Sequence, residues 1–396
     1  MKCLKAIGIA VCGLAMLAGT AFAKEDFPNE WYGAGGVVDD YALVSRENEP
    51  GFTYTPSPEQ WRDRNIYQLF TDRFATDGNI RVKNYRPAWD CEYTGDGLNR
   101  QFPFNRNYHH GGSWKGLQYQ IPYLQGMGVT AVWISGVQQN DQSVTDNRWT
   151  PYHQYHVDNF FRCDPAMGTF QDLKDVIDAL HAAGIAVILD VAPNHMCDKN
   201  GWGTKDEDKQ FHWDDSGKHW WDNNNKHCVP FDNLDRFHVQ GTINNWDSHP
   251  ENKIGQFKGT DDLKQEDPTT SDILYKAFKN LIDATDCDGF RVDAIKHIEY
   301  DWCRNWAQAM RDHAAWRGKK NFLMFGELFS YDTGALASWC ADGYGFNSAL
   351  LFPLMQAMNN AFGNGYSTYL WARKSAASSS TAPARKTPSR SWTTTT

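Results

Sequence analysis

Residues 170–195 read FQDLKDVIDALHAAGIAVILDVAPNH, which places a helix, a turn and a strand in succession. Apolar side chains recur there at three-and-four spacing, at Leu173, Val176, Ile177 and Leu180. This spacing predicts an amphipathic helix over 170–183. Gly184 ends the helix, and the apolar run 186–189 predicts a buried strand. A helix that returns to a buried strand is typical of a parallel sheet with helices outside it.

The same alternation extends along the chain in both directions. Apolar runs predict six strands, over 66–70, 130–134, 186–189, 289–294, 322–326 and 346–352. Helical spacing predicts helices over 117–127, 170–183, 271–283 and 303–316. A TIM barrel needs eight βα units. The predicted fold is therefore an α/β chain of the (β/α)8 TIM barrel class, incomplete, with about six of the eight units.

One long segment interrupts the alternation. Residues 196–262 lack helical periodicity and are rich in Asn, Asp, Gly, His and Trp. The segment is too long for an ordinary βα loop, so we expect a small inserted domain after the third strand. It divides the barrel into 61–195 and 263–371, and 24–60 form an irregular N-terminal lead-in.

The N-terminal residues are typical of an export signal. Lys2 and Lys5 precede an apolar stretch over 6–20, and Ala-Phe-Ala at 21–23 ends it. The stretch is shorter than the roughly 20 residues that span a membrane. We expect a signal peptide over 1–23 and a secreted protein, extracellular or periplasmic, without membrane attachment after cleavage. The net charge of −9 is spread along the chain, which argues against nucleic-acid binding. We also expect the protein to be a monomer.

The cysteines and tryptophans leave two questions open. Two of the nine cysteines, Cys3 and Cys12, lie in the signal peptide, which leaves an odd number, seven, in the mature chain. Export permits disulfides, and a Cys197–Cys228 bridge would join one loop-rich segment. None of the seven has the C-x-x-C spacing of a zinc site, so we interpret them as structural. The inserted domain also carries tryptophans that could stack on a flat ligand, such as a sugar, or form its core: Trp202, Trp213, Trp220 and Trp221.

Charged residues follow three successive predicted strands, where barrels place their working side chains. Side chains alternate along a strand, so Arg291 and Asp293 share one face. A guanidinium lowers the pKa of a neighbouring carboxyl and keeps it ionised, as a nucleophile requires. Glu327, after the next strand, is close enough to donate a proton. Two carboxyls in different environments are what retaining glycoside hydrolysis uses. A structural salt bridge would be enough to explain an Arg-x-Asp sequence found by itself. Three charged motifs at the ends of three successive strands favour a catalytic site instead.

These three motifs, DVAPNH at 190–195, GFRVDAIKH at 289–297 and FGEL at 325–328, resemble conserved regions of glycoside hydrolase family 13, the α-amylase family. The similarity extends over about 64–354. It implies that Asp293 is the nucleophile and Glu327 the general acid/base. It also implies that Arg291 and His195 bind the sugar at the cleaved bond, supported by Asp190.

A second group of matches concerns the substrate. The tetrapeptide at 152–155 resembles the family's Tyr-His-Gly-Tyr, with Gln154 in place of glycine. The resemblance implies that Tyr155 stacks on the glucose ring at the cleaved bond and that His153 hydrogen-bonds to it. Ordinary core packing is the alternative for Tyr155. Lys296 and His297 resemble the pair that contacts the leaving side of the sugar chain.

A third match concerns a metal ion. The segment GTDDLKQEDP at 259–268 resembles the region that closes the family's inserted domain, which calcium pins to the barrel. The implied ligands are Asn194, Asp262 and the backbone carbonyl of His297, with a further ligand inside the insert. Carboxylate, amide and backbone oxygens are what calcium prefers. A solvated loop aspartate is the alternative for Asp262.

The C-terminal stretch differs from the rest of the chain. Residues 372–396 contain no acidic residue, five Lys or Arg and twelve Ser or Thr. A disordered linker is one interpretation. Another follows from the genetic code: Trp-Thr-Thr-Thr-Thr at 392–396, read one base earlier, permits Val-Asp-Asn-His-Asp, which resembles a family region otherwise missing. We therefore hypothesise that the chain is C-terminally truncated and frameshifted after about Trp371, and inactive as written.

The resemblance predicts a secreted enzyme that hydrolyses α-1,4-glucosidic bonds in starch and maltooligosaccharides. A glucan transferase or maltogenic enzyme of the same family is the first alternative, and the Lys296–His297 pair favours amylase or cyclodextrin-forming types. A non-catalytic glycan-binding relative is the second alternative, but such proteins typically lose the pair that Asp293 and Glu327 form here.

Overall fold

The structure is a computed structural model, and it describes residues 27–33, 37–79, 81, 108–141, 150–198, 227–257 and 260–369. Three predictions lie outside these residues: the signal peptide over 1–23, the four tryptophans of the insert, and the aberrant stretch 372–396.

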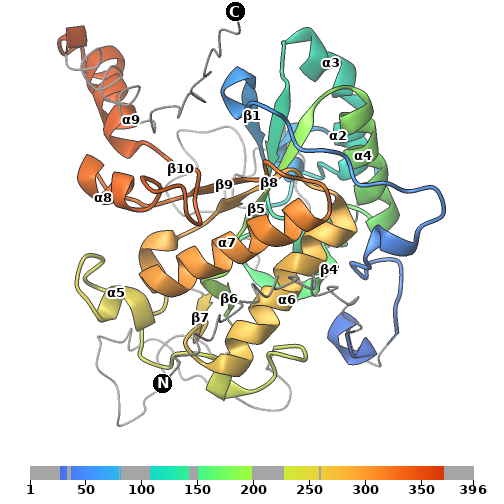
Figure 1. Cartoon of the computed structure of the whole chain (residues 1–396), viewed down its shortest axis with the longest axis horizontal. Coiled ribbons are helices and arrows are strands. Elements are labelled where there is room, and N and C mark those ends of the chain that lie inside the picture. Colours follow the sequence, from blue (N-terminus) through green and yellow to red (C-terminus); the bar gives the residue numbers. More distant parts are fainter. Residues whose placement is uncertain are drawn as a thin grey trace, which may run out of the picture.

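A curled sheet of six strands forms the centre of the molecule (Figure 1). Its order is β1 (Ile66–Leu69), β2 (Ala131–Ile134), β5 (Ala186–Val191), β8 (Gly289–Val292), β9 (Leu323–Gly326) and β10 (Ser348–Ala349). All neighbouring pairs are parallel. The central strands β5 and β8 are buried throughout and apolar except for Asp190 and Arg291, as expected of a parallel sheet with covered faces. The predicted incomplete (β/α)8 barrel of six strands is confirmed.

Helices pack on the outer face of this sheet. The three long ones are α4 (Phe170–Ala182), α6 (Pro268–Thr285) and α7 (Tyr300–Trp316). Phe278 of α6 and Trp306 of α7 meet edge to face, and both are fully buried. The shorter helices are α1 (Thr71–Phe74), α2 (Trp114–Tyr119), α3 (Ile121–Gly126), α8 (Thr333–Ser338) and α9 (Phe352–Met358), the last followed by a π-helical turn at Asn359–Gly363. In the described part of the chain, no helix is both long and apolar enough to cross a membrane.

Two predicted elements are shorter than expected. The helix expected over 117–127 is broken at Gln120 into α2 and α3, because Pro122 lies in the first turn of α3 and cannot donate to a preceding carbonyl. The strand expected over 346–352 is reduced to β10, since α9 already begins at Phe352 with Pro353 in its first turn.

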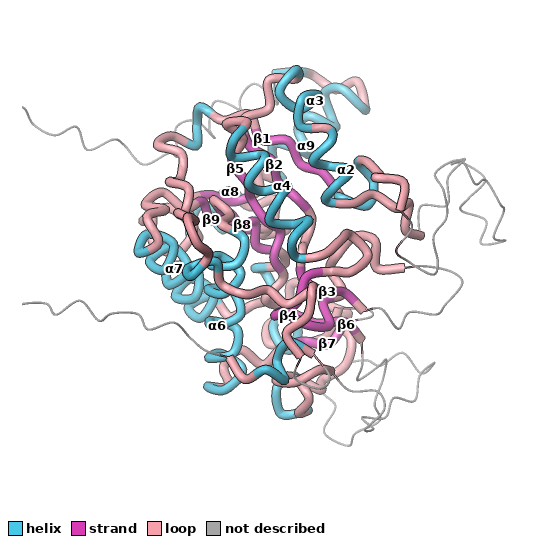
Figure 2. The backbone as a smooth tube through the Cα atoms, turned by 90° about the vertical axis from the view of Figure 1, so that its right-hand side faces the viewer, coloured by secondary structure: helices cyan, strands magenta, loops and turns pink. Residues whose placement is uncertain are grey.

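Two antiparallel pairs were not predicted. β3 (Gln138–Asn140) pairs with β4 (Val157–Cys163), and β6 (His195–Cys197) pairs with β7 (Thr260–Asp262). The four strands lie together at one end of the main sheet (Figure 2). Because Met196 lies opposite Asp261, the two ends of the expected inserted domain are hydrogen-bonded to each other. The segment between them contains α5 (Glu251–Ile254). Single 3-10 turns occur at Asn29–Tyr32, Arg46–Asn48, Trp61–Asp63, Leu234–Arg236 and Ile295–His297.

Candidate active site

Three carboxylates surround one buried arginine at the carboxyl ends of β5, β8 and β9. Nη1 of Arg291 lies 2.7 Å from Oδ1 of Asp190 and 2.8 Å from Oδ1 of Asp293. Nη2 lies 2.6 Å from Oε2 of Glu327. The sheet register explains this meeting, since it pairs Arg291 with Asp190 on β5 and with Phe325 on β9, two residues before Glu327. The structure thus brings the predicted carboxyl pair and its arginine together.

The two carboxyls of the predicted catalytic pair lie beside the same guanidinium. Asp293 contacts Nη1 of Arg291, and Glu327 contacts Nη2. Burial raises the pKa of Asp293 well above its usual value; Arg291 opposes this, while Asp190 and Glu327 reinforce it. We expected Arg291 to lower this pKa, but its single charge is shared among three acids.

Asp190 anchors the other side of the arginine. It accepts hydrogen bonds from Nε1 of Trp133 and from the hydroxyl of Tyr155, both at 2.9 Å, besides the contact with Arg291. Burial raises the pKa of Asp190, and the charge of Arg291 opposes that rise. From its sequence context, Trp133 was predicted only as part of a strand. Its position one residue before the end of β2 is the signal that would have placed it in the site.

The tetrapeptide 152–155 lies beside this cluster. The Tyr155 hydroxyl accepts from Nη1 of Arg291 at 3.1 Å, and the His153 ring stacks on the Tyr155 ring with centroids 5.6 Å apart. Nε2 of His195 lies 3.1 Å from the Tyr155 carbonyl. Burial lowers the pKa of His153 to about 3 and that of His195 to about 4. Both imidazoles are therefore neutral near pH 7. Both nitrogens of His195 are engaged by the protein, Nε2 by the Tyr155 carbonyl and Nδ1 by the Asn194 amide.

Lys296 and His297 lie in the 3-10 turn after β8 and face the inserted segment. Nζ of Lys296 lies 2.5 Å from Oδ1 of Asp247. The His297 ring meets the rings of Phe257 and Trp246 at centroid distances of 4.6 and 5.5 Å. Asp247, Phe257 and Trp246 were not predicted as partners of this pair, because they lie in a stretch of sequence without periodicity.

A second missed group follows β1. The Asp72 carboxylate accepts from the His110 backbone at 3.0 Å and lies 3.1 Å from Nδ1 of His109. Arg73 lies with its guanidinium 3.7 Å above the centre of the Tyr152 ring. The cation–π contact fixes the start of the segment that carries His153. Asp72 and Arg73 follow β1 closely, as Asp190 lies near the end of β5. This position of charged residues near a strand end was the sequence signal that could have identified the group.

Two buried oxygens fit the predicted calcium site. Oδ1 of Asn194 and Oδ1 of Asp262 accept no hydrogen bond from the described residues. Nδ2 of Asn194 lies 3.2 Å from Nδ1 of His195, which turns Oδ1 of Asn194 away from that ring. Leaving such acceptors buried without a partner is costly, whereas an oxygen-binding cation would satisfy both. The role of the His297 carbonyl stays a prediction.

Comparison with known proteins agrees with this geometry. The model of the α-amylase catalytic domain matches residues 68–376. The α-amylase of Streptomyces lividans is 29% identical over 64% of this chain and 31% of its own length. A cyclomaltodextrin glucanotransferase of Bacillus sp. strain 38-2 is 34% identical over 67% of this chain and 34% of its own. The chain therefore spans about a third of these curated relatives.

Solved structures give the same result. The α-amylase of Geobacillus thermoleovorans, complexed with acarbose, is 25% identical with a TM-score of 0.55, covering 76% of this chain and 54% of that one. The α-amylase of Malbranchea cinnamomea is also 25% identical, with a TM-score of 0.62 and coverage of 83% and 60%. With a family model that matches most of its length, this chain belongs to the α-amylase family of glycoside hydrolases.

Proposed function

We propose that this chain carries the active site of a retaining glycosidase that cleaves α-1,4-glucosidic bonds through a covalent glycosyl-enzyme intermediate. The convergence of Asp293 and Glu327 on Arg291 supports the proposal. An inverting pair stands about 6.5–9.5 Å apart to admit a water, whereas a retaining pair is separated by about 5–5.5 Å. Asp293 and Glu327 contact the two terminal nitrogens of one guanidinium, and this close placement favours the retaining geometry.

The reaction proceeds in two displacements. Glu327 donates its carboxyl proton to the leaving glycosidic oxygen while an oxygen of Asp293 attacks the anomeric carbon. The departing sugar carries that proton away, and Glu327 then removes one from an incoming water that releases the second product. Arg291 and Asp190 hold the nucleophile in place, and Tyr155 presents its ring beside it.

The substrate assignment follows the family and the surroundings of the site. We propose starch-like glucans and maltooligosaccharides, with Tyr155 and His153 against the ring at the cleaved bond. Lys296, His297 and the half-exposed Trp246 form the side toward the leaving group. We also propose that Asn194, Asp262 and the His297 carbonyl hold calcium, and that the enzyme is a secreted monomer.

Trapping the intermediate tests the mechanism. A fluorinated α-glucosyl fluoride, which forms the intermediate faster than it is hydrolysed, should add one sugar mass to the peptide containing Asp293. Asp293→Asn and Glu327→Gln should each lower starch hydrolysis by several orders of magnitude. Asp272→Asn, on the exposed face of α6, is the matched control. Labelling of another residue, or an inverted first product, would reject the proposal.

A glucan transferase is the second candidate, favoured by the 34% identity to cyclomaltodextrin glucanotransferases. Both activities form the same intermediate and differ in the acceptor that resolves it. The products from soluble starch distinguish them: cyclic glucans indicate transfer, and linear maltooligosaccharides indicate hydrolysis.

A further inference from the structure

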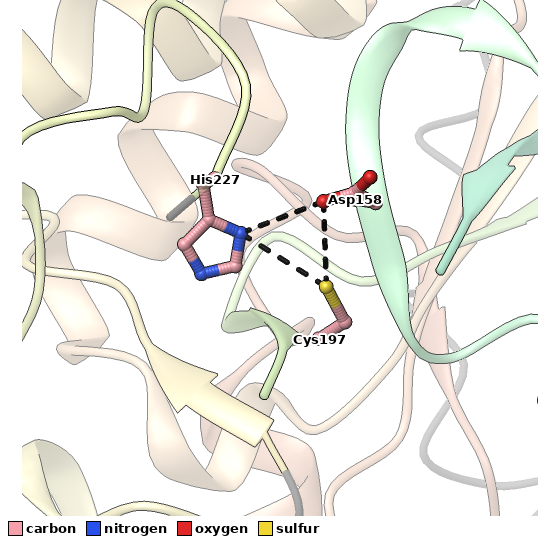
Figure 3. Close-up of side chains that lie close together, drawn as sticks. All are labelled: Asp158, Cys197 and His227. Carbon is pink, nitrogen blue, oxygen red and sulfur yellow. Dashed lines mark hydrogen bonds and ion pairs between the residues drawn. The ribbon is translucent and has the colours of Figure 1, made fainter. Parts of the chain in front are cut away.

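Three side chains of the types that ligate metals lie close together, outside the Arg291 cluster. They are Asp158 on β4, Cys197 at the end of β6, and His227 at the start of the segment 227–257, and their donor atoms point toward one another (Figure 3). Sγ of Cys197 lies 3.6 Å from Oδ1 of Asp158 and 3.9 Å from Nδ1 of His227. Nδ1 of His227 lies 3.8 Å from Oδ1 of Asp158. The three atoms thus form a nearly equilateral triangle.

The size of this triangle fits a small tetrahedral cation. Zinc bonds of about 2.0–2.3 Å to oxygen, nitrogen and sulfur place the ligand atoms about 3.3–3.6 Å apart. The observed triangle is only slightly larger, so a cation could contact all three atoms after small movements. Thiolate and imidazole select zinc-class ions, whereas calcium takes oxygen ligands only. The donor set is therefore distinct from the pair formed by Asn194 and Asp262.

The surroundings resemble those of metal-bound histidines. Nε2 of His227 lies 2.8 Å from Oδ2 of Asp261, a fully buried residue of β7. A carboxylate on the far nitrogen orients a ligating imidazole and leaves the near nitrogen for the metal. The His227 ring also stacks on Phe237, with centroids 4.7 Å apart, so that its orientation is fixed on both sides. The Cys197 side chain is fully buried, and that of Asp158 is 12% exposed.

We propose that Asp158, Cys197 and His227 bind a zinc-class divalent cation that ties the 227–257 segment to β4 and β6. Binding displaces the thiol proton of Cys197 and any proton on Nδ1 of His227, so that the metal meets a thiolate, a neutral imidazole and a carboxylate. The site is structural, because none of its ligands contacts the Arg291 cluster. It also replaces the Cys197–Cys228 disulfide that the sequence suggested, since no disulfide joins the six described cysteines.

Cobalt substitution tests the proposal on the full chain. The protein is stripped with a chelator, returned to excess calcium and titrated with Co2+ and then Zn2+. One equivalent of Co2+ should give a thiolate-to-cobalt charge-transfer band, which Zn2+ abolishes. Cys197→Ser should remove the band and weaken zinc binding by at least about a hundredfold. Asp261→Asn should weaken it by about 10–100-fold. Cys163→Ser, equally buried on the same strand as Asp158, should leave the band unchanged.

A second measurement on the unmodified chain covers the case in which Cys197→Ser does not fold. Because Cys197 is buried, alkylation is carried out at a urea concentration that exposes it in the metal-free protein; zinc should then protect Cys197, but not Cys340, as read by peptide mass spectrometry. The proposal is overturned if no thiolate band forms, if the band persists in Cys197→Ser, if zinc leaves Cys197 reactive, or if the purified protein contains a Cys197–Cys228 disulfide.

Discussion

Arg291 is surrounded by more acid than its own charge can neutralise. Its guanidinium contacts Asp190, Asp293 and Glu327, and only 4% of the residue is exposed. Removing one partner from such a buried network leaves an uncompensated charge. The groups that hold these acids in place are therefore expected to matter as much as the acids themselves.

Trp133 is one such group, and its indole donor can be removed while most of its ring remains. We expect Trp133→Phe to leave an oxygen of Asp190 without that donor, which costs about 1–3 kcal/mol of stability, and to lower kcat about 10–100-fold. Trp302→Phe on α7 is the matched control, because it also loses an indole hydrogen bond, to Ser271, but far from the site. Steady-state kinetics and urea unfolding measure both. Equal activity of the two variants would show that Asp190 does not need this donor.

The neutral histidines beside Tyr155 predict a pH dependence of stability. The pKa values of His153 and His156 are lowered to about 3, mainly by burial, against about 6.5 in the unfolded chain. The unfolded state binds more protons between these values, so the stabilisation is complete above pH 6.5 and declines as the pH falls toward 3. His181 has the opposite sign: its carboxylate partners Asp286 and Asp288 outweigh burial and raise its pKa to about 9, so its contribution is lost as the pH rises through 9.

Urea unfolding from pH 5 to 9 tests this assignment. The double variant His153→Gln/His156→Gln should flatten the acid side of the profile, and His181→Gln should flatten only the alkaline side. An unchanged acid slope in the double variant would contradict the prediction.

The β6–β7 strand pair explains how a bound calcium ion would stabilise the protein. Asn194 precedes β6 and Asp262 ends β7, so a cation between them would fix both ends of the inserted segment to the barrel. We expect calcium at a hundred times its Kd to stabilise the protein by about 2.7 kcal/mol, measured as a rise in Tm that EGTA reverses. Asn194→Ala should abolish the rise, whereas Asn233→Ala, in the same segment, should retain it. An equal rise in both variants would place the ion elsewhere.

The strands and long helices could be predicted because their apolar residues repeat with one period. α4 is found within one residue of its predicted end, and its Thr169–Asp172 capping box fixes its start. β3 and β7 could not be predicted, because Gln138–Asn140 and Thr260–Asp262 are polar strands held by tertiary contacts. Propensity alone carries no signal for such strands.

The active site was predictable to a similar degree. Strand-end position and alternation identified Arg291, Asp293 and Glu327 from the sequence. The Asp158–Cys197–His227 cluster was not predictable, because its members come from three elements whose approach depends on the inserted segment. The direction of the Asp293 pKa shift was also missed, since it depends on burial and on a third acid.

The inner face of the central six-stranded sheet is open. A hollow of about 960 Å³ lies between β1 and β10, lined by Ile66, Trp133, Leu323, Phe325 and the two residues of β10. Ile66 is 45% exposed, an unusual state for an apolar barrel strand. In a closed barrel such side chains fill the interior, so this surface is expected to be unstable in water.

The open inner face predicts how the chain behaves in solution. The chain should enhance the fluorescence of a hydrophobic dye, because exposed apolar surface and unpaired strand edges favour association. Ile66→Gln should lower the dye signal, whereas Tyr123→Gln, at an exposed position of α3, should leave it unchanged. Equal dye signals from the two variants would contradict the prediction.

The shared guanidinium has a consequence for inhibitor design. Three carboxyls contact Arg291, so the acids outnumber the single positive charge of its guanidinium. A flattened sugar ring with positive charge at its anomeric carbon would neutralise that excess, and a neutral ground-state ring would not. Sugar analogues with a protonated ring nitrogen should therefore bind more tightly than their uncharged counterparts of the same shape.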